Sequence, residues 1–183
     1  IDQEESMAFL AAYDTDGFNR WEAGQRLYTS LIFQTMKDGP SDQTLKYVDE
    51  AFQRALKDSE STEYSYQAYA MTLPTESTLA EDMEVVDPIG IHKSRETVKK
   101  GLARHFADDL RSRYDALTKV IEQDTEFKVD SEAIGRRRLR NVLLDYLCSI
   151  RETEEEQTIA AELAMIHFEK AKGMTDKMAA LAA

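Results

Sequence analysis

The sequence predicts an all-α protein of about nine helices, arranged as antiparallel hairpins that form an irregular α-superhelical array. Glycine and proline, the residues that interrupt helices, number only 7 and 3 among 183 residues. Apolar residues recur every three or four positions, as on one face of a helix, and no segment alternates like a strand. No fixed repeat length is evident, so a regular solenoid of the tetratricopeptide or ankyrin type is not expected.

Five helices are expected in the first half of the chain. A polar turn ending at Gly17 separates the first from the second, and the pair Gly39–Pro40 ends the second. Ser41 is placed to cap the third, whose polar exit is the segment 58–61. Pro74 ends the fourth, because the residue before a proline is pushed out of helical geometry. The expected ranges are 3–13, 18–37, 42–57, 64–73 and 75–85.

The second half predicts four longer helices. The pair Asp87–Pro88 is a strong start signal, an N-cap carboxylate followed by a proline whose missing N–H costs nothing at the first helical position. A sustained apolar stripe then predicts one continuous helix across Gly101, which is tolerated there. Asp130 or the following serine caps the next helix, and Thr153 and Glu156 have the spacing of a capping box. The expected ranges are 88–121, 131–150, 153–172 and a last helix that begins at Thr175.

Length and charge limit the domain organisation and the partners. A chain of 183 residues fits one domain or a portion of one. It begins at Ile1 rather than Met and stops inside a helix-forming run, so we expect a fragment of a longer protein.

With 23 basic and 35 acidic residues the net charge is −12, which disfavours nucleic acid and anionic membranes as partners. No apolar run reaches the ~20 residues that span a bilayer. A single cysteine, Cys148, favours a reducing compartment, and we expect a cytoplasmic protein.

The chain offers no recognisable catalytic, cofactor-binding or metal-ligating residues. Its three histidines, His92, His105 and His167, do not form a His-Glu-x-x-His zinc motif. Cys148 has no histidine or acidic partner at a fixed spacing, so we interpret it as a small buried residue. Phosphate-binding glycine loops and nucleophile elbows are also missing from the sequence. We therefore expect a helical module without an active site or a cofactor of its own.

Two clusters of charge have structural interpretations that we prefer to functional ones. The basic run Arg136–Arg140 has the chemistry to bind phosphate or carboxylate, but its arginines point in several directions around a helix. Asp130, Glu132 and Asp145 are within reach of it, so we expect a solvated or ion-paired face. The acidic run Glu152–Glu156 sits at the start of a helix, where the helix dipole favours carboxylates without a metal ion.

The most specific motif of the chain is DGFNRWEAGQ at Asp16–Gln25. Further motifs follow it: Leu73–Glu76, Asp87–Pro88 with Ile91–His92 and Arg95–Glu96, Arg138–Asn141 with Tyr146–Leu147, and Met174–Asp176 with Ala179–Leu181. In this order they resemble the motifs of the alanyl aminopeptidase (aminopeptidase N) family of zinc metallopeptidases. The resemblance covers nearly the whole chain except the region around 122–129. Any one motif alone is weak, whereas the ordered set is specific.

This resemblance implies that residues 1–183 are a fragment of a single helical C-terminal cap domain. The family's zinc-binding catalytic domain would lie elsewhere in the same polypeptide, as would the zinc itself. In such enzymes the helical domain encloses a chamber over the active site and restricts the access of peptides. Single amino acids, with Ala among those favoured, are released from peptide N-termini. The partners implied are the catalytic domain and the peptide substrates.

Two other interpretations remain open from the sequence. A free-standing acidic helical adaptor would use the amphipathic stripes as grooves for partner helices, and it predicts exposed apolar patches. An independent helical enzyme would use His92, His105 or His167 as a general base, although no partner residue can be identified for any of them.

Overall fold

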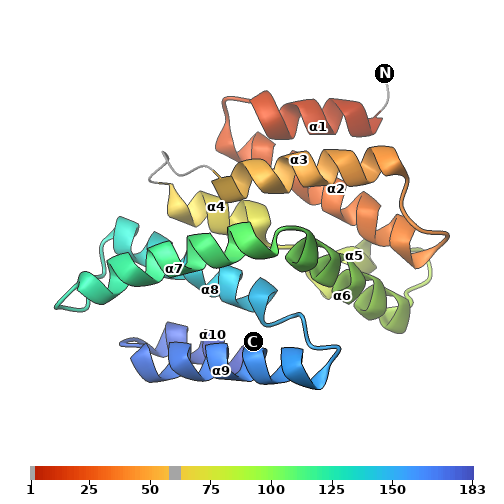
Figure 1. Ribbon diagram of the computed structural model, residues 1–183. Helices are drawn as coiled ribbons and strands as arrows, with labels where there is room; N and C mark the ends of the chain where they lie inside the picture. The colour runs from red at the N-terminus through yellow and green to blue at the C-terminus, as the bar shows by residue number, and fades with distance from the viewer. Residues whose placement is uncertain (1–2, 58–62) are drawn as a thin grey trace. The chain divides into compact units, whose positions relative to one another are not determined.

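The computed structural model describes residues 3–57 and 63–183 as helices joined by short turns (Figure 1). No strand occurs in these two ranges, which confirms the predicted all-α class. The polar exit expected at 58–61 lies outside the described residues. The ten helices are α1 (Gln3–Tyr13), α2 (Gly17–Met36), α3 (Asp42–Lys57), α4 (Tyr64–Met71), α5 (Glu76–Glu81), α6 (Pro88–His105), α7 (Ala107–Gln123), α8 (Ser131–Leu147), α9 (Glu154–Lys170) and α10 (Met174–Ala182).

Most helix starts are where the sequence predicts them, because the expected capping residues do cap. The Asp130 carboxylate accepts a hydrogen bond of 2.9 Å from the backbone N–H of Ala133. Thr153 and Glu156 form the predicted capping box, with each side chain accepting from the other's backbone N–H at 3.1 Å. The other predicted starts with an observed side-chain cap are those at Ser41, Thr75 and Asp87.

One predicted helix is wrong in its continuity. The stripe from Pro88 predicts a single helix to about residue 121, whereas the structure has two, α6 and α7, separated at Phe106. Phe106 has φ −105° and ψ 18°, outside ideal helical values, although hydrogen bonds from Phe106 to Leu102 and from Leu110 to Phe106 continue on both sides. The Phe106 side chain is buried, as are Leu102 and Leu110 on either side, so the apolar stripe continues across the point where the backbone leaves helical geometry. Gly101 lies within α6, where the sequence predicts that it is tolerated.

The chain divides into two compact units. The first comprises residues 1–55 and 69–101, and the second comprises residues 56–68 and 102–183. Helices α3, α4 and α6 contribute residues to both units. Within the part of the chain that the structure describes, no helix is both long and apolar enough to cross a membrane.

In the first unit a single carboxylate joins three helices. Glu4 of α1 accepts hydrogen bonds from the hydroxyl of Ser30 and from Nε2 of Gln34 (2.9 Å), both on α2. It also accepts one from the hydroxyl of Thr44 on α3 at 2.7 Å, and Thr44 is fully buried. Because a carboxylate can accept several hydrogen bonds, Glu4 satisfies these polar groups at the contact of α1 with α2 and α3.

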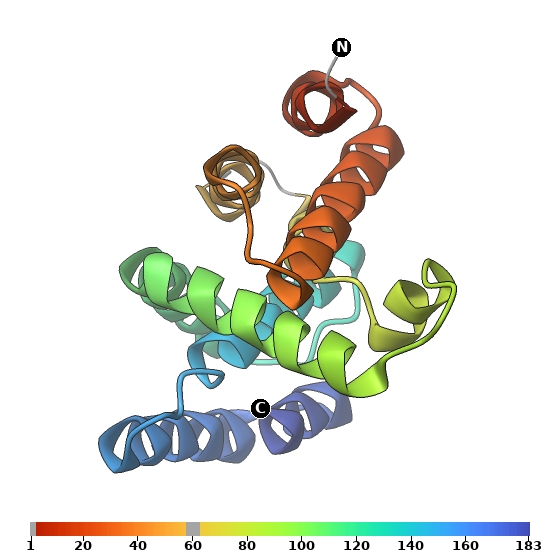
Figure 2. The same ribbon diagram turned by 90° about the vertical axis from the view of Figure 1, so that its right-hand side faces the viewer.

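The second unit is built from two helical hairpins. Figure 1 shows α7 and α8 running in opposite directions side by side, and α9 and α10 form the next hairpin at the blue end of the chain (Figures 1 and 2). Helix α10 packs on both α8 and α9. Large apolar side chains of α7 and α8 fill the core between these helices, with the fully buried members Leu110, Leu139, Leu143, Leu144 and Tyr146. This packing places the inner faces of α7, α8, α9 and α10 around one buried polar cluster.

Candidate functional site

The three histidines lie in different environments. His92 on α6 is largely exposed, and its Nδ1 is 2.8 Å from the carboxylate of Glu76. The ring of His105, at the end of α6, packs edge-on against the ring of Phe106 with centroids 4.5 Å apart. His167 on α9 is buried. In residues 3–57 and 63–183, no three or more His, Cys, Asp or Glu side chains gather closely enough to hold a metal ion.

His167 is part of a buried pair with Tyr114 of α7. The Tyr114 hydroxyl lies 2.9 Å from Nδ1 of His167, and both residues are at most 4% exposed. Burial, with a smaller contribution from the nearby Arg140 cation, lowers the pKa of His167 from 6.5 to about 4. Burial also raises the pKa of the Tyr114 phenol. Both groups are therefore neutral at pH 7 and out of reach of a substrate, which argues against His167 as a general base.

Next to this pair lies a buried ion pair that the sequence analysis did not anticipate. Nη2 of Arg140 on α8 is 3.4 Å from Oδ2 of Asp176 on α10, and both residues are at least 96% buried. Asn141 donates a hydrogen bond of 2.9 Å to the other oxygen of Asp176. Burial lowers the pKa of Arg140, and the negative charge of Asp176 opposes that effect. The acid and the base of this pair are 36 residues apart in sequence, a separation that helix periodicity cannot detect.

Three polar atoms of this cluster have no hydrogen-bond partner among the described residues: Nε of Arg140, Oδ1 of Asn141 and Nε2 of His167. Buried polar groups in native proteins are almost always hydrogen-bonded, to protein or to water. A cavity of about 30 Å³ lies beside the cluster, lined by Arg140 and Asp176 among others. That volume fits one or two water molecules and excludes a peptide.

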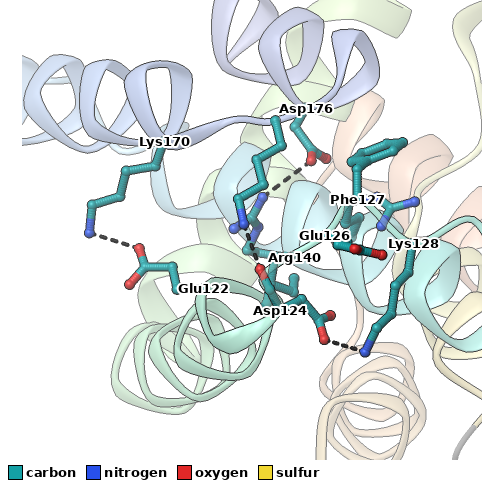
Figure 3. Close-up of a pocket in the computed structure, with 11 residues that line it drawn as sticks. Glu122, Asp124, Glu126, Phe127, Lys128, Arg140, Lys170 and Asp176 are labelled. Carbon is teal, nitrogen blue, oxygen red and sulfur yellow. Dashed lines mark hydrogen bonds and ion pairs between the residues drawn. The ribbon is translucent and has the colours of Figure 1, made fainter.

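Ion pairs surround this cavity (Figure 3). Lys170 at the end of α9 is 2.7 Å from Glu122 of α7. Lys172 donates to the backbone carbonyl of Asp124 at 2.6 Å, and the Asp124 carboxylate pairs with Lys128. These contacts fasten the α7–α8 connection to the end of α9. The charged side chains around this small cavity are paired with one another or with the backbone. We therefore interpret them as a network that stabilises the fold.

The basic run on α8 is paired largely as predicted. Arg136 forms an ion pair with Glu132 and also lies over the ring of Tyr64, 5.5 Å from its centroid. Arg137 lies 4.5 Å from the centroid of the Phe127 ring. The aromatic contacts of Arg136 and Arg137 and the deep burial of Arg140 were not predicted. Cys148 is 1% exposed, as predicted, and its thiol donates to the carbonyl of Ala160 at 3.5 Å.

The first unit has an open groove of about 410 Å³ between α1 and the start of α2. Its lining includes Asn19, Glu22 and Ala23, three residues of the sequence segment 16–25 that carries the most specific motif. Asn19 donates to the Asp14 carboxylate at 3.3 Å, and Glu22 pairs with Arg26 at 2.6 Å. The groove is large enough for a peptide segment, unlike the cavity of the second unit.

Comparison with known proteins gives a consistent result over nearly the whole chain. Residues 4–183 match the family model described as "Domain of unknown function (DUF3458_C) ARM repeats". Aminopeptidase N of Caulobacter vibrioides is 34% identical over 172 residues, and that of Escherichia coli is 32% identical over 183 residues. These matches cover 94% and 98% of the chain but only 19% and 20% of the relatives' lengths. The chain thus spans about a fifth of the curated relatives that it matches.

The fold also recurs in a solved structure. A crystal structure of Legionella pneumophila aminopeptidase A in complex with aspartic acid matches with a TM-score of 0.76 and 23% sequence identity. The match covers 99% of this chain and 21% of that chain. The same succession of helices therefore occurs as one portion of a much longer polypeptide.

Proposed function

Because this chain belongs to the DUF3458_C family of ARM-repeat domains and matches the C-terminal helical domain of aminopeptidase N, we propose that it is the non-catalytic part of a zinc-dependent aminopeptidase. The whole enzyme releases N-terminal amino acids, with Ala among those favoured, from peptides. This part helps to enclose the chamber over the active site and restricts the access of peptides to it.

The observation that carries this proposal is the extent of the match. Nearly all of the chain aligns with aminopeptidases, yet it accounts for only about a fifth of their length. The described residues supply no set of zinc donors, and the one strongly perturbed histidine, His167, is sealed in a core. In this proposal catalysis and the zinc ion belong to the rest of the polypeptide. The single, buried Cys148 is consistent with a cytoplasmic location.

The open groove at α1 and α2 supports a role in substrate access. Its size is compatible with a peptide, and its lining includes Asn19, Glu22 and Ala23 of the segment that resembles the aminopeptidase motif. Its rim carries both acidic and basic side chains, Asp14, Glu22 and Arg26, which suits a surface that meets a zwitterionic peptide chain.

The proposal is tested on the native protein. An antibody raised against residues 1–183 captures the protein from its source, and the captured material is assayed for hydrolysis of alanine arylamide with and without a chelator. We expect chelator-sensitive activity on a polypeptide about five times as long as this chain, as the share of the relatives implies. Material captured with pre-immune serum serves as the control. An inactive protein of the chain's own size would contradict the proposal.

The access role has its own measurement. An enclosed chamber predicts that kcat/KM for peptides with N-terminal Ala falls steeply as the peptide lengthens, and that folded proteins with the same N-terminus are not cleaved. Equal rates on short peptides and on folded proteins would contradict a chamber while leaving the aminopeptidase assignment intact.

A free-standing acidic adaptor is the second candidate, and the exposed apolar residues of the last two helices favour it. It predicts a native protein no longer than this chain, bound to a separate partner. The capture experiment distinguishes the two, because the adaptor would bring down a second polypeptide and no peptidase activity.

A further inference from the structure

The carboxylate of Asp176 is the meeting point of the buried polar cluster in the second unit. Its Oδ2 lies 3.4 Å from Nη2 of Arg140, and its Oδ1 accepts the hydrogen bond of 2.9 Å from Asn141. A well-formed hydrogen bond between a cation and a carboxylate is shorter, at about 2.7–2.9 Å. A carboxylate also offers about four acceptor positions, and these two contacts occupy only part of them. Asp176 therefore has the capacity to accept a further hydrogen bond.

Arg140 has the complementary feature, a donor that lacks an acceptor. Its Nε–H has no hydrogen-bond partner among the residues that the structure describes, and the residue is only 4% exposed, so bulk solvent does not supply one. A buried N–H without an acceptor costs free energy, and native proteins almost always satisfy it with a protein group or an ordered water. The contact with Asp176 does not satisfy it, because that contact is made by Nη2 of the same guanidinium.

The cavity of about 30 Å³ brings these two features together. Both Arg140 and Asp176 line it (Figure 3). Asp124 lines it as well, and the carbonyl oxygen of Asp124, which accepts from Lys172, has a second lone pair. The cavity is therefore bordered by a donor and by acceptors at once, and its volume admits water but no larger ligand.

This combination of groups selects the ligand. The ligand must accept from Arg140 and donate to oxygen atoms. Chloride or another small anion can only accept, and the carboxylates of Asp176 and Glu122 would repel it. A metal cation would be repelled by the guanidinium, and the described residues hold no group of three or more His, Cys, Asp or Glu suited to bind one. Water both accepts and donates, and two to four polar partners are enough to hold it.

We propose that this cavity is a binding site for one ordered water molecule, which accepts a hydrogen bond from Nε of Arg140 and donates to the carboxylate of Asp176 and to the carbonyl oxygen of Asp124. This water joins α8, α10 and the connection between α7 and α8 through a single set of hydrogen bonds. Its role is to complete the buried ion pair, so the proposal does not depend on the aminopeptidase assignment.

A crystal structure of the full-length polypeptide, at a resolution that shows ordered water, tests this site. We expect a peak in the electron density about 2.7–3.2 Å from Nε of Arg140 and from an oxygen of Asp176. A direct hydrogen bond from Nε to a protein group, or density without such a peak, would overturn the proposal. An anomalous signal at the same position in crystals grown with bromide in place of chloride would identify an anion and would also overturn it.

Two variants of residues that line the cavity test which group holds the water. Arg140→Lys keeps the positive charge but removes Nε–H, and we expect the peak to be lost from its crystal structure. Glu122→Gln is the matched control, because it changes the partner of Lys170 on the same cavity and leaves Nε in place, so the peak should remain. A peak that is unchanged in Arg140→Lys, or one that disappears equally in both variants, would contradict the assignment of Nε as the donor.

Discussion

Arg140 and Asp176 form an ion pair of 3.4 Å in which the two side chains are only 5% and 3% exposed. The pair joins α8 to α10, and Asn141 orients the acid by a further hydrogen bond. Separated charges in a protein interior are costly, so each member depends on the other. The pair thereby fixes which face of α10 packs against α8.

Removal of one partner of this pair should be more damaging than removal of both. We expect Asp176→Ala to lower the free energy of unfolding by about 3 kcal/mol, because it leaves a buried guanidinium without a counter-charge. The double variant Arg140→Met with Asp176→Leu should recover most of that loss, since it replaces the pair by apolar side chains of similar size. Urea unfolding followed by circular dichroism measures both. A double variant less stable than Asp176→Ala would contradict this account.

The buried His167 should make the protein sensitive to acid. Its pKa is about 4 in the folded chain against an ordinary 6.5, so below pH 6.5 the unfolded chain binds a proton that the folded chain does not. Stability contributed by neutral His167 is thus complete above pH 6.5 and is lost as the pH falls toward 4. At about 1.4 kcal/mol for each tenfold difference in proton affinity, the loss is on the order of 3 kcal/mol.

Two variants isolate this contribution from that of the carboxylates, which also titrate in acid. His167→Gln should remove the extra loss of stability between pH 7 and pH 4.5, whereas Tyr114→Phe should retain it, because burial is the main cause of the lowered pKa. The measurement is the urea midpoint of each variant at both pH values. If the urea midpoint of His167→Gln falls as much between pH 7 and pH 4.5 as that of the wild type, His167 does not contribute to the loss of stability in acid.

The fold was predictable where local chemistry decides it. Asp130 and the pair of Thr153 and Glu156 are short-range signals, and the structure has caps at each of them. Phe106 shows the limit, because it is buried like Leu102 and Leu110 on either side, and the apolar periodicity therefore runs unbroken across the point where α6 ends and α7 begins.

The buried polar cluster of Arg140, Asp176, Tyr114 and His167 could not be predicted from the sequence for a related reason. Arg140 belongs to a run of arginines that all read as surface residues, and only α10, which folds back onto α8, brings Asp176 to it. Likewise the contact of Tyr114 with His167 joins residues 53 positions apart. Residues so far apart in sequence have no characteristic spacing when they are in contact, so composition and periodicity cannot predict such pairs.

The capping box at the start of α9 should contribute measurably to stability. Thr153→Ala removes the acceptor for the backbone N–H of Glu156, and we expect a loss of about 1 kcal/mol in the free energy of unfolding. Thr158→Ala is the matched control: it removes a hydroxyl of the same helix that only donates to the carbonyl of Glu154. Because Ala is the better helix former, this control should be neutral or slightly stabilising. Equal losses for the two variants would mean that the cap has no special contribution.

Two glycines of α6 and α8 should respond in opposite ways to the same substitution. A Cβ at Gly101 meets nothing within 4 Å, so Gly101→Ala should stabilise the chain by up to about 1 kcal/mol through helix propensity.

A Cβ at Gly135 would lie 3.0 Å from Cβ of Tyr64 and 3.1 Å from the backbone nitrogen of Ser65. Here a methyl group on α8 would require the start of α4 to shift by a few tenths of an ångström, and backbone moves aside less easily than a flexible side chain. We expect Gly135→Ala to destabilise by about 1–3 kcal/mol despite the same gain in propensity. Thermal unfolding of the two variants beside the wild type decides the matter, and a Tm that rises for both would show that α8 and α4 have room to separate.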